Sequence, residues 1–184
     1  MKTLQTIILL ILILIPQNAN ANSYENSKTH ALGFAAGSTY GIGLSYSHDW
    51  EHHGIQFTAL PVWDQEDGGM IAGGINFKKN FHQNHKIGVY GSFGIAGMMM
   101  RDVWEECAWV AEAEEEYCLT VTEDSRNYAV GPGVGFEVNF WHNMLFRFEL
   151  PLAVRNGTDG FGISPIPNAA IMYRWDAPRK ILKF

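Results

Sequence analysis

Strict alternation of bulky apolar residues with small or charged ones runs through residues 127–155 and predicts a long β-hairpin. On its first arm the apolar positions are Tyr128, Val130, Pro132, Val134, Phe136, Val138 and Phe140. On its second arm they are Met144, Phe146, Phe148, Leu150, Leu152 and Val154. Consecutive side chains of a strand point to opposite faces. Each arm therefore has one bulky apolar face and one face of small or charged residues.

The length of these arms favours a membrane over a soluble sheet. Strands of soluble proteins usually run about 5 to 6 residues, whereas a tilted strand that crosses a membrane needs about 9 to 11. The face opposite the bulky one carries glycines with Glu137, Arg147, Glu149 and Arg155, which would make a poor core for a sandwich. We therefore expect the bulky face to contact lipid and the other to line a narrow lumen.

The same alternation predicts six further strands, at 30–37, 40–47, 55–63, 70–77, 87–95 and 163–175. The 40–47 pattern assigns Tyr40 to the lipid face, and 48–53 and 78–85 are expected to be turns. The fold class predicted is all-β: a closed, up-and-down antiparallel transmembrane barrel of eight strands, an even number as single-chain barrels require. An eight-stranded barrel is filled by its own side chains. We therefore expect Glu137, Arg147, Glu149, Arg155 and Arg174 to form lumen ion pairs and not a channel.

The N-terminus has the pattern of a secretory signal peptide. Lys2 precedes an apolar run at 7–15, and the small-residue pattern of 19–21 follows. We assign 1–21 to the signal peptide, 22–175 to the barrel and 176–184 to a C-terminal tail; an uncleaved N-terminal anchor is the alternative. No later segment has eighteen consecutive apolar residues, so no transmembrane helix is predicted after it.

Histidine and aromatic residues recur together in the turns at 48–53, 80–82 and 139–143. All three turns fall at the same end of an up-and-down barrel, where an aromatic girdle at the membrane surface is expected. With the N-terminus in the periplasm, that end is periplasmic. A metal site is one interpretation of His48, Glu51, His52 and His53. Adjacent residues of a strand point to opposite faces, so we favour a solvent-exposed turn at the membrane surface.

The segment 101–126 is a long acidic loop, expected to be extracellular. It holds nine acidic residues against two arginines: Asp102, Glu105, Glu106, Glu112, Glu114, Glu115, Glu116, Glu123 and Asp124. It also contains the only two cysteines, Cys107 and Cys118, in a chain bound for an oxidising compartment, which favours a disulfide over metal-binding thiols.

A disulfide constrains the shape of this loop. On one straight helix the two Cα atoms would lie roughly 16 Å apart, far beyond the roughly 4.4 to 6.8 Å of a disulfide. We therefore predict a hairpin that prolongs the two flanking strands, with its turn at 111–114. The register predicted places Arg101 opposite Asp124 and Val103 opposite Thr122.

The glutamates Glu112, Glu114, Glu115 and Glu116 allow two interpretations. They form either a surface for a cation or a basic partner, or a solvated charge cluster that keeps the loop soluble. Their spacing matches no calcium-binding loop, so we predict no metal site and no cofactor. Trp104 and Trp109 either anchor a partner or pack across the hairpin.

In these strand patterns the chain resembles the small eight-stranded outer-membrane β-barrel proteins of Gram-negative bacteria, which include the OmpA-like and OmpX-like barrels. Residues 171–175 also resemble the C-terminal signal that ends such barrels, although the chain continues to Phe184, so either Trp175 or Phe184 ends the signal. The resemblance implies an outer-membrane location. The partners it implies are membrane lipid, lipopolysaccharide and the barrel-insertion machinery, and no nucleic acid.

The predicted function is non-enzymatic, a structural or surface-binding role through the acidic loop. One alternative is an enzyme that modifies lipid A, which needs a histidine near the outer leaflet. All seven histidines are predicted away from that side: His30, His48, His52, His53, His82, His85 and His142. A second alternative is a soluble periplasmic barrel that binds an apolar ligand.

Overall fold

The computed structural model describes residues 29–64, 68–83, 86–110, 115–140, 143–158 and 160–176. The predicted signal peptide, most of the predicted tail and the loop tip at 111–114 lie outside the described residues. Within the described ranges, no helix has the length and hydropathy needed to cross a membrane.

Antiparallel strands make up nearly all of the described chain. They are β1 (Thr29–Gly37), β2 (Gly41–Trp50), β3 (His53–Asp64), β4 (Gly68–Gln83), β5 (Ile87–Val110), β6 (Glu115–Phe140), β7 (Met144–Pro151), β8 (Ala153–Gly157), β9 (Gly160–Ser164) and β10 (Asn168–Asp176).

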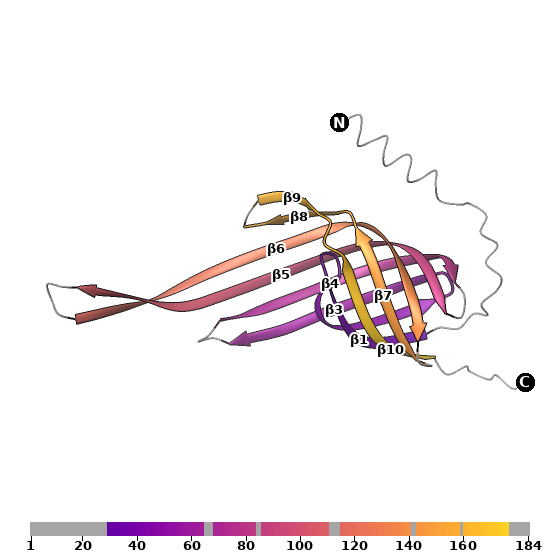
Figure 1. Ribbon diagram of the computed structural model, residues 1–184, viewed down its shortest axis with the longest axis horizontal. Coiled ribbons are helices and arrows are strands. Elements are labelled where there is room, and N and C mark those ends of the chain that lie inside the picture. Colours follow the sequence, from indigo (N-terminus) through magenta and orange to yellow (C-terminus); the bar gives the residue numbers. More distant parts are fainter. Residues whose placement is uncertain are drawn as a thin grey trace, which may run out of the picture.

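The strands close into a ring, which confirms the predicted fold class (Figure 1). Each strand from β1 to β7 pairs with the next, β10 pairs with β7, and β1 pairs with β10. β8 continues β7 beyond Leu152 along the same partner, β6, and β9 folds back on β8 alone. Ring closure leaves no unpaired edge within the ring itself, as backbone in lipid requires.

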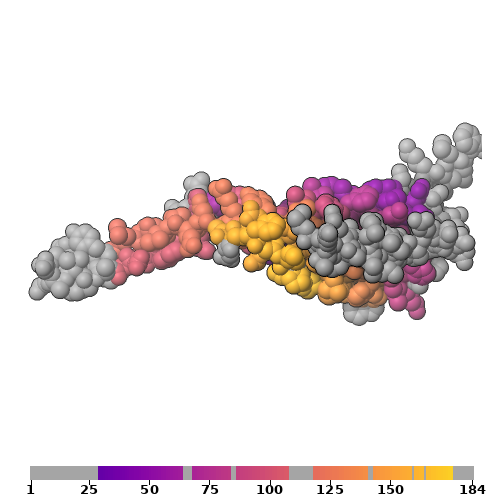
Figure 2. All heavy atoms as spheres, turned by 90° about the horizontal axis from the view of Figure 1, so that it is seen from above, coloured from indigo at the N-terminus to yellow at the C-terminus, as the bar shows by residue number. Residues whose placement is uncertain are grey.

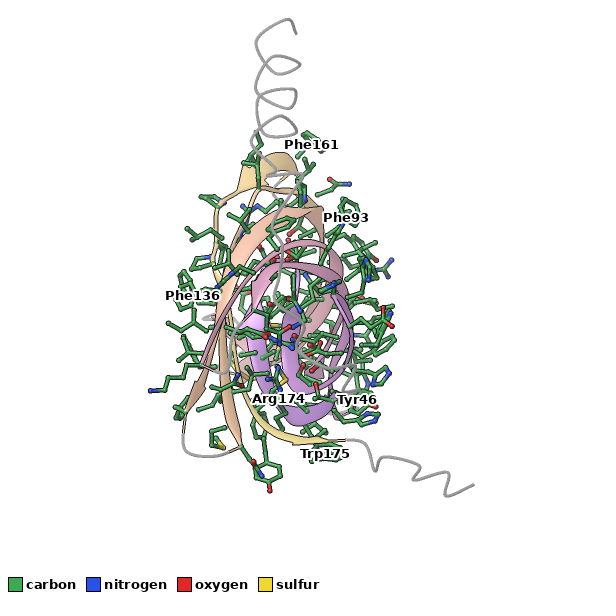
Figure 3. The ribbon with its side chains drawn as sticks, turned by 90° about the vertical axis from the view of Figure 1, so that its right-hand side faces the viewer. Tyr46, Phe93, Phe136, Phe161, Arg174 and Trp175 are labelled. Atoms are coloured by element: carbon green, nitrogen blue, oxygen red, sulfur yellow. A yellow bond between two sulfur atoms is a disulfide. The ribbon has the colours of Figure 1, made fainter. Side chains whose placement is uncertain are left out.

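Bulky apolar side chains cover the outside of the ring. Phe34 is 65% exposed and Val134 is 59% exposed, whereas inward positions such as Ser45 and Gln56 are buried. In Figure 3, Phe93 and Phe136 point away from the ring, and Arg174 lies within its outline. An apolar exterior around a polar interior inverts the pattern of a soluble protein. It is the pattern of a barrel that crosses a bilayer.

The strands extend to different extents at the two rims of the barrel. Thr29 of β1 pairs with Asp176 of β10, so both described ends of the chain lie at one rim. At the other rim β5 and β6 run on together as a two-stranded ribbon that projects far beyond the remaining strands (Figures 1 and 2). We call its residues 101–110 and 115–126 the acidic hairpin.

The last predicted strand, 163–175, is interrupted. β9 ends at Ser164 and β10 begins at Asn168. Pro165 and Pro167 stand between them, and proline has no N–H to donate to a ladder. The prediction of one continuous strand is therefore wrong: β9 belongs to a small hairpin above the rim, and only β10 belongs to the ring.

The β1–β2 turn folds into the barrel, so the assignment of Tyr40 to the lipid face is wrong. Thr39 and Tyr40 are buried in the lumen. The turn comes so close to the inner walls of β4 and β5 that a Cβ at Gly74 would collide with the Tyr40 carbonyl oxygen, and one at Gly94 would lie 2.9 Å from Thr39 Cβ. Only glycine leaves room for the turn at these positions. We call residues 38–40 the turn plug.

Placing arginine on the lipid face tests the membrane orientation of the barrel. Val134 lies midway along the part of β6 that belongs to the ring, so Val134→Arg should lower the unfolding free energy in lipid vesicles by about 2 to 4 kcal/mol. Phe161 of β9 is 78% exposed but lies above the rim. Phe161→Arg should therefore change it by less than about 0.5 kcal/mol. Equal effects in guanidinium titrations of the two variants would contradict the orientation.

Candidate functional site

Five charged side chains meet inside the barrel, near the rim that holds the chain ends, and we call them the lumen network. They are Asp49, Lys78, Glu137, Arg147 and Arg174. Lys78 Nζ lies 2.7 Å from Glu137 Oε2 and 3.2 Å from Asp49 Oδ2. Arg147 bridges the same carboxylates, with Nη2 2.7 Å from Asp49 Oδ2 and Nε 3.1 Å from Glu137 Oε2. Both carboxylates are thus shared between two cations.

Arg174 completes the network from β10. Its Nη2 lies 3.3 Å from Asp49 Oδ2 and 3.4 Å from Glu137 Oε1, and its Nη1 donates to Asn139 Oδ1. Arg147 Nη1 also donates to Gln56 Oε1. The contributing residues come from six of the ring strands, so the network braces the barrel across its interior. Arg147 is only 1% exposed, and a buried ion is costly unless it is paired and hydrogen-bonded.

Glu149 lies in a separate cluster higher in the lumen, beneath the turn plug. Tyr40 Oη donates to Glu149 Oε2 at 3.2 Å, and Asn168 Nδ2 donates to Glu149 Oε1 at 2.8 Å. Thr39 Oγ1 also donates to Glu149 Oε1, and the hydroxyls of Tyr40 and Tyr90 are hydrogen-bonded to each other at 2.9 Å. These bonds attach the turn plug to β5, β7 and β10 and close the lumen at this level.

The structure divides the five lumen residues expected from the sequence. Glu137, Arg147 and Arg174 share the lumen network. Glu149 is bonded to neutral donors and makes no ion pair with a described residue. Arg155 lies in β8, exposed and opposite Ala129, well above the network, because β8 continues the strand beyond the barrel core. The expectation that it joins the lumen ion pairs is wrong.

Sequence reasoning missed Asp49 and Lys78, which it placed in turns. Both predicted turns are too wide, because β2 runs to Trp50 and β4 to Gln83. The alternation of inward and outward positions along each strand could have identified both residues. Asp49 continues the inward series of Ser45, and Lys78 continues that of Asn76.

Stacked histidine and aromatic rings line the part of the rim near the chain ends that β10, β1, β2, β3 and β4 form. The His30 ring lies 4.5 Å from that of His48 and 5.8 Å from that of Trp175, and the His48 ring lies 5.5 Å from that of Trp50. His53 stands beside Phe77. The described histidines all lie at this end, away from the hairpin, and His85 and His142 lie outside the described residues. His48 and His53 are part of this aromatic band, and the histidines at 48–53 do not converge with Glu51 on a common point.

The acidic hairpin has the predicted covalent and hydrogen-bonded geometry. Cys107 and Cys118 form a disulfide with Cα atoms 4.0 Å apart. The ladder pairs Arg101 with Asp124 and Val103 with Thr122, so the predicted register is confirmed. Above Asp102 and Asn127, β5 and β6 pair with no other described strand. The hairpin is therefore a free-standing ribbon.

One face of the ribbon combines apolar and acidic side chains. On this face, Trp104 stands opposite Val121, Glu106 opposite Leu119, and Asp102 opposite Glu123. Leu119 is 71% exposed, and the Trp104 side chain is also exposed. We call it the acidic-aromatic face. Directly opposed like charges, as at Asp102 and Glu123, destabilise a sheet, so hairpin stability does not explain this pair.

The opposite face carries an ion pair at its base. Arg101 donates from Nε to Asp124 Oδ1 at 2.7 Å and from Nη2 to Asp124 Oδ2 at 3.0 Å, and its guanidinium lies 5.2 Å from the centre of the Trp63 ring. The hydrogen bonds from Arg101 lower the pKa of Asp124 below its usual range. The pair's contribution to stability is thus present above the ordinary aspartate pKa and is lost as pH falls through the lowered one.

The structure describes only part of the predicted glutamate cluster. Glu112 and Glu114 lie outside the described residues. Glu115 and Glu116 belong to the β6 ladder, opposite Val110 and Trp109. Among the described side chains, the one group with metal-ligand spacing joins Glu105 to the two cysteines, whose sulfurs are already bonded to each other. Thiolate ligation is therefore impossible there.

A closed ring with an apolar exterior and a filled, charged interior defines the class: a small integral outer-membrane β-barrel protein. The N-terminal β-barrel domain of Pseudomonas aeruginosa OprF has a similar fold at 12% identity and a TM-score of 0.44, covering 82% of this chain and 98% of that one. Ail, the attachment invasion locus protein of Yersinia pestis, is 12% identical with a TM-score of 0.42, covering 82% and 99%. No family model matches the chain, and no curated protein matches it.

Removing Arg147 should strongly destabilise the barrel. Arg147→Met leaves Asp49 and Glu137 with fewer buried cations, and breaking a buried ion pair costs about 3 to 5 kcal/mol. Arg155→Met is the matched control, because it removes the same groups from an exposed position, and should cost less than about 0.5 kcal/mol. Guanidinium unfolding in lipid vesicles measures both. Similar losses for the two variants would contradict the role of the network.

Removing the disulfide should loosen the hairpin and leave the barrel intact. The bridge joins residues 11 apart in sequence, and closing a loop of this size contributes about 2 to 3 kcal/mol by the chain-entropy estimate. In a variant with Cys107→Ser and Cys118→Ser, amide hydrogen exchange at 103–106 and 119–122 should speed up accordingly. Amides at 87–96, within the barrel, should exchange as before. Faster exchange throughout the barrel would contradict the independence of the ribbon.

Proposed function

We propose that the protein is a non-enzymatic outer-membrane anchor that presents the acidic hairpin as a binding surface for a basic partner. The observation that carries this proposal is the ribbon itself. It extends two barrel strands without interruption, is cross-linked by a disulfide, and exposes an acidic-aromatic face that no described part of the chain covers.

The interior of the barrel supports a role as an anchor and not as a channel. The lumen network joins opposite walls near one rim, and the turn plug closes the lumen further up. A solute crossing the barrel would have to break both sets of bonds. Binding from above, in contrast, requires no change in the barrel.

The acidic-aromatic face suits a partner that is both cationic and apolar. Asp102, Glu106 and Glu123 attract positive charge, and they surround an exposed apolar strip that includes Trp104. Tryptophan is enriched among residues that dominate binding energy, and charges at the rim of an interface mainly speed encounter and select the partner. We therefore infer a basic peptide or protein surface with apolar side chains. A lone metal ion fits this face less well.

A peptide-binding measurement tests this function with a matched pair of variants. The probe is a fluorescent peptide of alternating lysine and leucine, titrated by anisotropy against the full-length protein in lipid nanodiscs. Glu105 and Glu106 are adjacent but occupy opposite faces. Glu106→Gln should weaken binding about fivefold, and Trp104→Ala about tenfold or more, given hot-spot costs above about 1 kcal/mol. Glu105→Gln should change binding less than twofold.

Two further comparisons decide the outcome. A peptide with serine in place of leucine should bind the native protein more weakly, and raising the salt concentration should weaken binding of both peptides because exposed charges are screened. If Glu105→Gln and Glu106→Gln weaken binding equally, the peptide is attracted by the overall negative charge of the hairpin. The assignment of binding to the acidic-aromatic face is then wrong. If Trp104→Ala has no effect, the apolar part of the proposal is wrong.

A further inference from the structure

A cavity of about 600 Å³ lies at the outer mouth of the barrel, and nothing in the hairpin proposal uses it. Most of its lining is small or apolar. Ala72 of β4 and Ala96 and Met98 of β5 line it from the ring, and Ile166 and Pro167 line it from the segment that precedes β10. We call this cavity the mouth cup. Its volume falls within the roughly 300 to 1,000 Å³ of small-molecule sites.

The turn plug closes the cup from below. Ser38 lines the cavity, and its neighbours Thr39 and Tyr40 are buried and bonded to Glu149. The cup is therefore a blind pocket and not the entrance of a pore. A bound molecule has to enter and leave at its open upper end.

Two polar side chains give the cup an anion-binding side. Asn127 of β6 and Arg155 of β8 both line it. No described carboxylate lies within ion-pair distance of Arg155, in a protein of net charge −6 whose acidic residues are concentrated in the neighbouring hairpin. A guanidinium and an amide N–H₂ both donate hydrogen bonds to a carboxylate.

The cup also reaches the lipid-facing surface. Ile42 and Tyr128 line its edge and are 40% and 52% exposed on the apolar exterior. On the side of Ile42 the edge is low because β1 and β2 are joined by the turn plug, which bends inward. An apolar chain can pass from the outer leaflet over this edge without crossing water.

From these features we propose that the mouth cup binds a single-chain anionic amphiphile of the fatty-acid class. Its hydrocarbon chain lies between Ala72, Ala96 and Met98, and its carboxylate is held by Arg155 and Asn127. One chain suits a pocket of this size, with one cationic residue at its side. The site is independent of the acidic hairpin, so either proposal can fail without the other.

Photo-crosslinking tests the site in the full-length protein in lipid nanodiscs. The probe is palmitic acid with a diazirine in its chain, and mass spectrometry maps the attachment points. Cross-links should concentrate at Met98 and Ile166. Arg155→Gln should reduce labelling about tenfold, as expected when a hydrogen bond to a charged group is lost. Arg126→Gln is the matched control, because Arg126 lies beside Asn127 but faces outward, and it should label like the native protein.

Filling the cup supplies a second, independent variant. Ala96→Phe should abolish labelling, with Ala72→Leu as the alternative, and each variant is used only if it migrates as a folded barrel on an unheated gel. The methyl ester of the probe has no carboxylate, so it should label the native protein and the Arg155→Gln variant equally weakly. Cross-links spread over the lipid face, unchanged in Arg155→Gln and in the filled variants, would overturn the site. Displacement by lipid A but not by unlabelled palmitate would overturn the single-chain assignment.

Discussion

The pairing of Asp49 and Glu137 with three cations is the interaction on which the barrel depends. A closed eight-stranded ring must fill its own interior, and here much of that filling is charged. Each carboxylate lies within 3.4 Å of all three cations, Lys78, Arg147 and Arg174. Since an isolated buried ion costs far more than a paired one, the network holds the surrounding strands at the spacing that keeps all the charges in contact. The ring and its charged interior therefore require each other.

The turn plug completes the closure by a different chemistry. Glu149 accepts hydrogen bonds from hydroxyl groups of the turn and from an amide at the start of β10, and Tyr40 of the turn is hydrogen-bonded in addition to Tyr90 of β5. Small residues on the opposing walls allow the turn to enter. Bending inward lowers the rim at β1 and β2, and the mouth cup opens over that lowered rim. A feature that closes the lumen thus also shapes a side of the mouth that meets lipid.

The membrane-crossing strands could be predicted from the sequence because their side chains obey a period of two. The positions that face lipid, such as Val134 and Phe136, follow directly from that period, and so do the register and disulfide of the hairpin once Cys107 must reach Cys118. Strand ends were harder to place, because Asp49 and Lys78 are polar residues beside turns. Polarity suggested a loop, whereas in this barrel polar residues at inward positions form the core.

The sequence by itself determined the class of fold, the lipid-facing residues and the existence of a cross-linked acidic ribbon, since each depends on local alternation or on one covalent bond. Only the tertiary structure decided which charged side chains form ion pairs, that Tyr40 points inward, and that Arg155 lies at the outer mouth and not within the lumen network. Those outcomes depend on the relative height of strands distant in sequence and on space around Gly74 and Gly94. Local periodicity contains no information about either, because both arise only when the ring closes.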